Sequence, residues 1–217
     1  MMFSRVTSAA LVLGITHLQG TWAQANCTTT NLNTTADDTI FSIASATNRG
    51  VCDIARANRM ADAELLRANA TLLIPGESCS QDNESCLLVA QNTTTDCIFG
   101  GPHTYTTVTN DTIAKVALEK FGIPAAALTT GPVNDILAAG MSIKVPQCSP
   151  SQCTVQPYRF TYGTYKDLAK QFNTTVGQIF ALNPTYSYSS TLNESAAPVI
   201  TMPMDCRPLS ANYTVIS

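Results

Sequence analysis

The stretch ADDTIFSIA, residues 36–44, decides the fold because the chain repeats it. A second copy, TNDTIAKVA, spans residues 109–117, and a looser third copy, YGTYKDLA, spans residues 162–169. In the first copy, Ile40, Ile43 and Ala44 have the i, i+3, i+4 spacing of one helix face. Each copy therefore predicts a turn that leads into an amphipathic helix. A repeat of this kind indicates an array of small structural modules.

Each copy lies inside a longer unit with the order strand, helix, helix, strand. In the second unit, the strand YTTV precedes the turn, a short second helix starts at Pro124, and the strand MSIKVP closes the unit. The landmarks of the first unit have the same spacing. From Asn58 to Pro75 is 18 residues, as it is from Thr129 to Pro146. Equal lengths between equivalent landmarks favour a true repeat.

The sequence thus predicts an α+β fold of three tandem βααβ modules cross-linked by disulfides, since each unit of under 50 residues buries too little surface to be stable alone. Asp38 and Asp111 are the expected N-caps of the first helices in units one and two. The third unit lacks the residue equivalent to Asp111. The expected boundaries are a signal peptide at 1–25, modules at 28–76, 104–147 and 157–206, connecting segments at 77–103 and 148–156, and a tail at 207–217.

The first 25 residues have the features of a secretory signal. Arg5 precedes an apolar run that is too short to span a bilayer, and small residues surround the expected cleavage points. No later run approaches ~18 apolar residues, so we expect no membrane helix. The cysteines all follow this leader, and their even number in an oxidising compartment predicts four disulfides. They are Cys27, Cys52, Cys79, Cys86, Cys97, Cys148, Cys153 and Cys206. The connectivity is open, because eight cysteines allow 105 pairings.

Nine Asn-x-Ser/Thr acceptors predict a glycosylated extracellular protein. They begin at Asn26, Asn33, Asn69, Asn83, Asn92, Asn110, Asn173, Asn193 and Asn212. The net charge is −3 and no basic run occurs, which argues against nucleic acid or an anionic membrane as partner. No CxxC spacing is present and only His103 follows the leader, so neither a metal site nor a cofactor is expected.

The repeated pattern resembles the lysin motif (LysM) family. The second unit has YTTVTNDTIAKVA and closes with LAAGMSIKVP, the first has TTADDTIFSIA with AN and LLIP, and the third has YRFTYGTYKDLA with LNP and ITMP. A secreted chain of three such units is similar to fungal LysM effectors. The resemblance implies binding of chitin oligosaccharides, sequestration of chitin fragments from host immune receptors, and shielding of hyphal walls from chitinases.

The resemblance also implies which loops bind the sugar, namely the turn before the first helix and the turn after the second. Carried over by position, these turns contain Ala36, Asp37, Asp38, Thr39, Ile40, Asp62, Ala63, Glu64 and Leu65 in module one, Asn110, Asp111, Thr112, Ile113, Val133, Asn134, Asp135 and Ile136 in module two, and Gly163, Thr164, Tyr165, Tyr186, Tyr188 and Leu192 in module three. Turns of polar residues followed by Ile or Leu offer partners for acetamido groups and a floor for their methyl groups. The only tryptophan, Trp22, lies in the leader, so a Trp stacking platform is excluded.

Several of these residues have a second reading. Ile40 and Ile113 suit a core as well as a sugar floor, and Tyr165 suits sheet packing. Asn110 begins a glycosylation acceptor, and a glycan there would block the turn of module two. Modules one and three could clamp one oligomer, because the long first connecting segment lets them face each other.

Other functions compete with chitin binding. Glycan hydrolysis needs two carboxylates across a bond, and no cleft-forming domain is present to position them. A nucleophilic triad needs a histidine, and only His103 is available, so we expect no enzyme. A wall-associated structural or adhesion protein, a peptidoglycan-binding LysM protein and a ligand-induced homodimer are the alternatives.

Overall fold

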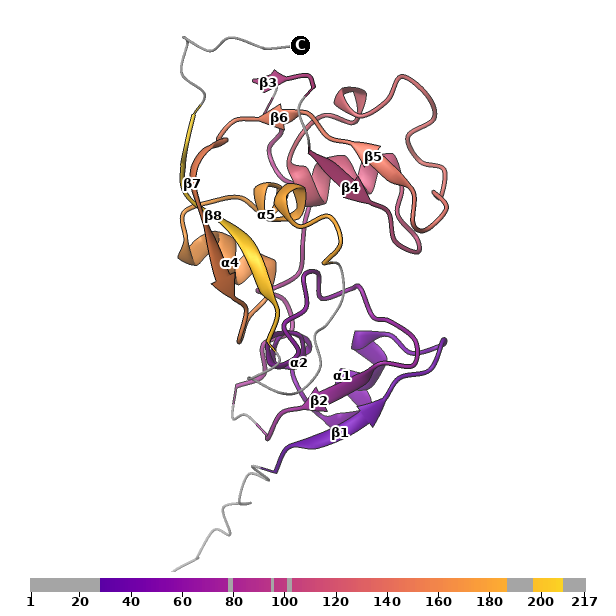
Figure 1. Cartoon of the computed structure of the whole chain (residues 1–217). Coiled ribbons are helices and arrows are strands. Elements are labelled where there is room, and N and C mark those ends of the chain that lie inside the picture. Colours follow the sequence, from indigo (N-terminus) through magenta and orange to yellow (C-terminus); the bar gives the residue numbers. More distant parts are fainter. Residues whose placement is uncertain (1–27, 78–79, 95, 101–102, 187–196, 209–217) are drawn as a thin grey trace, which may run out of the picture.

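The computed structural model describes residues 28–77, 80–94, 96–100, 103–186 and 197–208 (Figure 1). The expected signal peptide, Cys27, Cys79, Tyr188, Leu192, Asn26, Asn193 and Asn212 lie outside these residues. Three two-stranded antiparallel sheets each join the first and last strand of a unit with two helical segments between them. We call these unit 1, unit 2 and unit 3. None of the described helices is long and apolar enough to cross a bilayer.

Unit 1 has the expected order of elements. They are β1 (Thr30–Asn33), α1 (Ile40–Thr47), α2 (Val51–Ala57) and β2 (Thr71–Ile74). The apolar face predicted for α1 is buried, with Ile40, Ile43 and Ala44 at most 4% exposed. It packs with Ile54 of α2 and Leu72 of β2 in one core. The expected polar turn after α2 is buried instead, because Met60, Ala61 and Ala63 face the neighbouring units or the core.

Unit 2 departs further from ideal helices. Its elements are β4 (Thr104–Thr106), α3 (Ile113–Lys115), the π-helix η1 (Val116–Phe121), the 3-10 helix η2 (Ala125–Ala127) and β5 (Ser142–Lys144). The apolar stripe of the first helix is buried as expected, but one α-turn is followed by a π-helix. The second helix is a single 3-10 turn in which Pro124 is the N-cap and not the first helical residue.

Unit 3 is formed by β7 (Gln152–Arg159), α4 (Tyr165–Gln171), α5 (Val176–Leu182) and β8 (Val199–Arg207). The sequence assigned residues 148–156 to a connecting segment, but β7 already starts at Gln152. Its first residues pair with the end of β8, which extends the sheet into that segment. Tyr165, Phe160, Phe180 and Tyr186 form an aromatic cluster between the sheet and the helices.

Three disulfides join the described residues. They are Cys52–Cys86, Cys97–Cys148 and Cys153–Cys206. The first ties α2 to the connecting segment after unit 1, and the third joins the paired strands of unit 3. The second joins β3 (Cys97–Ile98) to β6 (Gln147–Cys148), which pair as a fourth small sheet. The segment 77–103 therefore packs on the units through two of the bridges.

In units 1 and 2 the N-caps lie one residue later than predicted. Thr39 caps α1, Thr112 caps α3 and Thr164 caps α4, and in each case the hydroxyl accepts the N–H of the residue three positions on. Asp38 and Asp111 close the preceding turns instead. The N–H of Thr35 donates to Asp38 (2.7 Å) and that of Val108 to Asp111 (2.9 Å).

The three units share buried surface. One core cluster contains Ala61 of unit 1, Tyr105 and Val116 of unit 2, and Ile179 and Phe180 of unit 3. In Figure 1, α5 lies between unit 2 and the sheet of unit 3, while unit 1 occupies the lower end of the molecule. The arrangement of the units is thus fixed by packing as well as by the chain.

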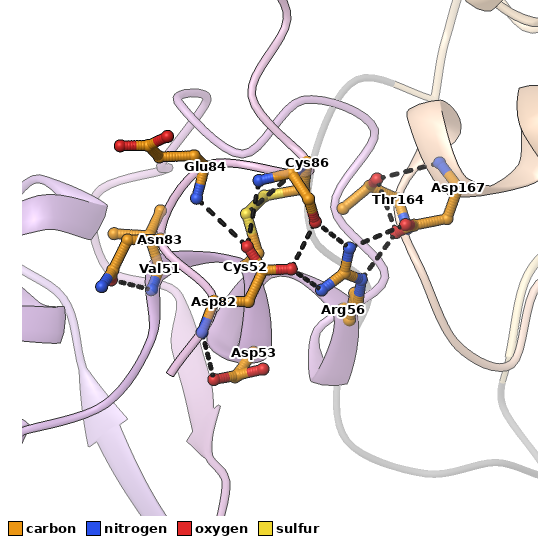
Figure 2. Close-up of polar contacts among 11 residues, drawn as sticks. Val51, Cys52, Asp53, Arg56, Asp82, Asn83, Glu84, Cys86, Thr164 and Asp167 are labelled. Carbon is orange, nitrogen blue, oxygen red and sulfur yellow. Dashed lines mark hydrogen bonds and ion pairs between the residues drawn. A yellow bond between two sulfur atoms is a disulfide. The ribbon is translucent and has the colours of Figure 1, made fainter. Parts of the chain in front are cut away.

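Arg56 of α2 links unit 1 to unit 3 (Figure 2). Its guanidinium binds both carboxylate oxygens of Asp167 in α4, at 3.0 and 2.9 Å, and Asp82 at 2.7 Å. Burial alone would raise the pKa of Asp167, but the hydrogen bond from Arg56 and those from Thr164 lower it. Burial also opposes ionisation of Asp82, but hydrogen bonds from Ser85 and Arg56 lower its pKa well below the usual range.

These lowered pKa values predict acid sensitivity. A carboxylate whose pKa is lower in the folded state stabilises the protein above its unfolded pKa, and that contribution is lost as the pH falls through the folded pKa. We expect stability to fall below about pH 4, and Arg56→Met to remove about 1 kcal/mol of that dependence after solvent screening. Urea unfolding between pH 2.5 and pH 7 checks this. Parallel pH profiles for the two proteins would contradict it.

Candidate functional site

A cleft of about 450 Å³ lies between the two turns of unit 1 and the first turn of unit 2. Its walls are residues Thr35, Ala36, Asp37, Asp38, Thr39, Glu64, Leu65, Leu66, Arg67, Ala68, Val108, Thr109 and Asn110. Of the residues predicted from sequence, it brings together Ala36, Asp37, Asp38, Thr39, Glu64, Leu65 and Asn110. The two turns expected to bind in module one thus line one cavity.

Hydrogen bonds fix the two turns of unit 1 to each other. The buried hydroxyl of Thr34 donates to the carbonyl of Arg67 (2.7 Å) and accepts the N–H of Ala70 (2.9 Å). The N–H of Asn69 donates to the carbonyl of Thr34 (2.9 Å). Asp38 also accepts the hydroxyl of Thr35. These bonds hold the two sides of unit 1 next to the cleft in place, which reduces the entropy lost on binding.

The walls combine polar groups with short apolar side chains. Hydrogen bonds from the N–H and hydroxyl of Thr35 lower the pKa of the half-buried Asp38, so this carboxylate is ionised and accepts hydrogen bonds at neutral pH. Asp37 and Glu64 add carboxylate acceptors, and Ala36, Leu65 and Ala68 add apolar surface. Such a cavity suits a neutral ligand rich in hydroxyl and amide groups.

Five other predicted residues are buried beneath the turns. Ile40, Asp62, Ala63, Asp111 and Ile113 are at most 7% exposed. The two isoleucines are buried core residues, which is the alternative to a sugar floor that their sequence positions allowed. Asp62 binds Lys120 of η1 at 2.7 Å, and Asp111 accepts the phenol of Tyr105 at 2.8 Å.

The two predicted turns of unit 2 also lie side by side. Thr112 forms an antiparallel bridge with Ile136, and the N–H of Ala114 donates to the carbonyl of Val133 (2.8 Å). Asn134, Asp135 and Ile136 are exposed, and Ile136 has 71% of its surface accessible. Unit 2 therefore presents a shallow surface of its own next to the cleft.

The predicted first turn of unit 3 is covered by unit 1. Gly163, Thr164 and Tyr165 are buried, and the N–H of Gly163 donates to the carbonyl of Arg56 (3.1 Å). The phenol of Tyr186 donates to the carbonyl of Arg59 (2.7 Å). Burial raises the pKa of both Tyr165 and Tyr186. Among the described residues, units 1 and 3 thus meet in direct contact.

Sequence reasoning missed six residues that line the cleft and two buried residues next to it; they are Thr35, Leu66, Arg67, Ala68, Val108 and Thr109, and Thr34 and Lys120. Only Lys120 had a signal: it stands seven residues after Ile113, on the same face as Val116 and Ala117, where a charged residue requires a buried partner. The others depend on how the two turns meet, which no local pattern reveals.

The chain is similar in sequence to proteins of one family. Residues 35–75 match the LysM domain, and this segment contains both turns of unit 1. The chain is 46% identical over 195 residues to the secreted LysM effector LysM13 of Penicillium expansum, covering 87% of this chain and 84% of the relative. It is 35% identical over 179 residues to the secreted LysM effector ECP6 of Passalora fulva, covering 78% and 75%. It is 36% identical over 116 residues to the secreted LysM effector ELP2 of Colletotrichum higginsianum, covering 52% and 64%.

Proposed function

The chain belongs to the secreted LysM effectors of fungi, and from this premise we propose that it is a non-catalytic protein that binds chitin oligosaccharides in the cleft of unit 1. Binding would sequester chitin fragments from host immune receptors. The observation that carries the proposal is that both turns of the matched LysM segment line one cavity of about 450 Å³.

The chemistry of the cleft supports a chitin ligand. Chitin is uncharged, so its binding requires no cluster of basic side chains. Among the described cleft walls Arg67 is the only basic side chain, and Asp37, Asp38 and Glu64 supply hydrogen-bond acceptors. N-acetylglucosamine offers hydroxyl and amide donors to these acceptors, and its methyl group suits Ala36, Leu65 or Ala68. The volume lies within the range of about 300–1,000 Å³ that is usual for small-ligand sites.

We further propose that units 2 and 3 are LysM modules, because they repeat the strand, helix, helix, strand order of unit 1. The wall formed by Val108, Thr109 and Asn110 supports a ligand shared between units 1 and 2. A clamp between units 1 and 3 has less support, since Gly163 and Thr164 are covered by direct contacts.

Calorimetric titration with chitohexaose, and with cellohexaose as control, tests the function. Saturable heat with chitohexaose alone is the expected result. Heat with neither sugar would overturn the proposal and favour a structural or adhesion role.

A variant locates the site. Ala68→Arg places a long side chain in the cleft, and we expect chitohexaose affinity to fall at least tenfold, about 1.4 kcal/mol. Ala126→Arg is the matched control, because Ala126 is an exposed alanine on η2 that does not line the cleft. Equal affinities for the two variants would place the sugar elsewhere.

A further inference from the structure

Asn110 has two properties that no other described residue combines. It begins the glycosylation acceptor Asn110-Asp111-Thr112, and it lines the cleft together with the turns of unit 1. Its side chain is exposed, so the acceptor nitrogen is accessible. Its backbone is left-handed, with φ of 67°. The site is therefore a glycosylation acceptor at the entrance of a sugar-binding cleft.

The chemistry of N-linked glycans makes this position informative. The first two sugars on a glycosylated asparagine are N-acetylglucosamine residues joined by a β-1,4 bond. This is the repeating unit and the linkage of chitin. A glycan on Asn110 thus carries the proposed ligand of the cleft within its own core. It is attached to a residue that itself lines the cleft.

We propose that the core disaccharide of the glycan on Asn110 occupies the cleft as a built-in ligand and competes with free chitin. This inference rests on the proposed function. In the glycosylated protein the two N-acetylglucosamine residues of the glycan then occupy part of the cleft. A free chitin oligomer must displace them to bind. Glycosylation of one asparagine sets the affinity of the neighbouring unit.

The other acceptors do not share this position. Asn33 and Asn69 are exposed at the ends of the unit 1 strands but do not line the cleft. Asn83 and Asn92 lie on the segment after unit 1 and line other cavities. Asn173 is exposed in unit 3 with a left-handed backbone, φ 49°, so it matches Asn110 in conformation but not in place.

The size of the effect follows from tethering. A short link gives an effective concentration of about 1 mM. For a core disaccharide with a dissociation constant of about 0.1–1 mM, the cleft is occupied from half to nine-tenths of the time, and free ligand binds about two- to tenfold more weakly.

The experiment compares the secreted glycoprotein with Asn110→Gly and Asn173→Gly. Glycine keeps the left-handed backbone at both positions and removes the acceptor. We expect Asn110→Gly to bind chitohexaose about two- to tenfold more tightly, and Asn173→Gly to bind like the unchanged protein. Asn110→Asp, which also removes the acceptor, should reproduce the gain.

Three further measurements complete the test. Glycopeptide mass spectrometry must find Asn110 occupied, and an unoccupied site overturns the proposal. Hydrogen exchange of residues 35–39 and 64–68 should be faster in Asn110→Gly than in the glycoprotein. Equal or weaker chitohexaose binding by Asn110→Gly overturns the inference while the proposed function stands, whereas no binding by any of the proteins overturns both.

Discussion

Replacing Lys120 by methionine is expected to lower the free energy of unfolding by about 3–5 kcal/mol, because it leaves two buried carboxylates without a counter-charge. The Lys120 side chain is 2% exposed and its ammonium lies 2.7 Å from Asp62 and 3.9 Å from Asp111. It also lies over the rings of Tyr105 and Phe180, at 5.6 and 5.3 Å from their centroids. The one charge therefore contacts all three units.

Lys115→Met is the matched control. Lys115 stands one turn earlier and pairs with Glu64 at 3.0 Å, but both side chains are about a third exposed. Such a pair contributes less than about 1 kcal/mol. Urea unfolding of the two variants should separate them clearly. If the two variants lost similar amounts of unfolding free energy, Lys120 would be solvated in solution and not buried as the structure has it.

A double variant distinguishes lost charge from lost packing. Replacing Lys120 by methionine together with Asp62 by leucine removes both members of the closest pair, and buried ion pairs replaced in this way often cost little. We expect the double variant to regain part of the stability lost by Lys120→Met. A further loss would show that the shape of the junction matters more than its charge.

The elements of unit 1 could be predicted because local spacing decided them. Ile40, Ile43 and Ala44 lie on one helix face whatever the tertiary structure, and Pro75 stops the strand before it. The caps were misplaced by one residue because Asp38 and Thr39 are both good caps. Only the hydrogen bond from Thr35 to Asp38 shows which residue closes the turn.

The site was predicted only in part, since it is formed by two units. Local pattern and family resemblance identified the turns around Ala36 and Glu64, but the wall at Asn110 depends on how unit 2 packs against unit 1. The burial of the predicted turn at Gly163 could not be foreseen for the same reason, because it results from contact with Arg56 of unit 1. Contacts between units are not encoded in the repeat that makes the units alike.

Removing the Cys52–Cys86 disulfide by replacing both residues with alanine is expected to cost about 4 kcal/mol. The bridge closes a loop with a sequence separation of 34 residues, and cross-linking a loop of that length restricts the unfolded chain by about this amount. Both cysteines are buried, at 0% and 1% exposed, so alanine also removes packing in the core of unit 1. Urea unfolding measures the loss.

Removing Cys52–Cys86 and removing Cys153–Cys206 should loosen different parts of the structure, although the second bridge also closes a long loop, with a sequence separation of 53 residues. β7 and β8 pair along their length without it, whereas residues 80–88 have no strand. Besides the bridge at Cys86, they are attached to α2 by the contacts of Arg56 with Asp82 and Ser85 and by hydrogen bonds from the N–H groups of Val51 and Cys52 to Asn83 and Asp82. Hydrogen exchange should therefore rise across residues 80–88 in the Cys52→Ala/Cys86→Ala variant, and stay low in the strands of the Cys153→Ala/Cys206→Ala variant. If residues 80–88 remained protected without their bridge, the hydrogen bonds of Arg56 and of the start of α2 would be sufficient to hold them, and the bridge would act on the unfolded chain alone.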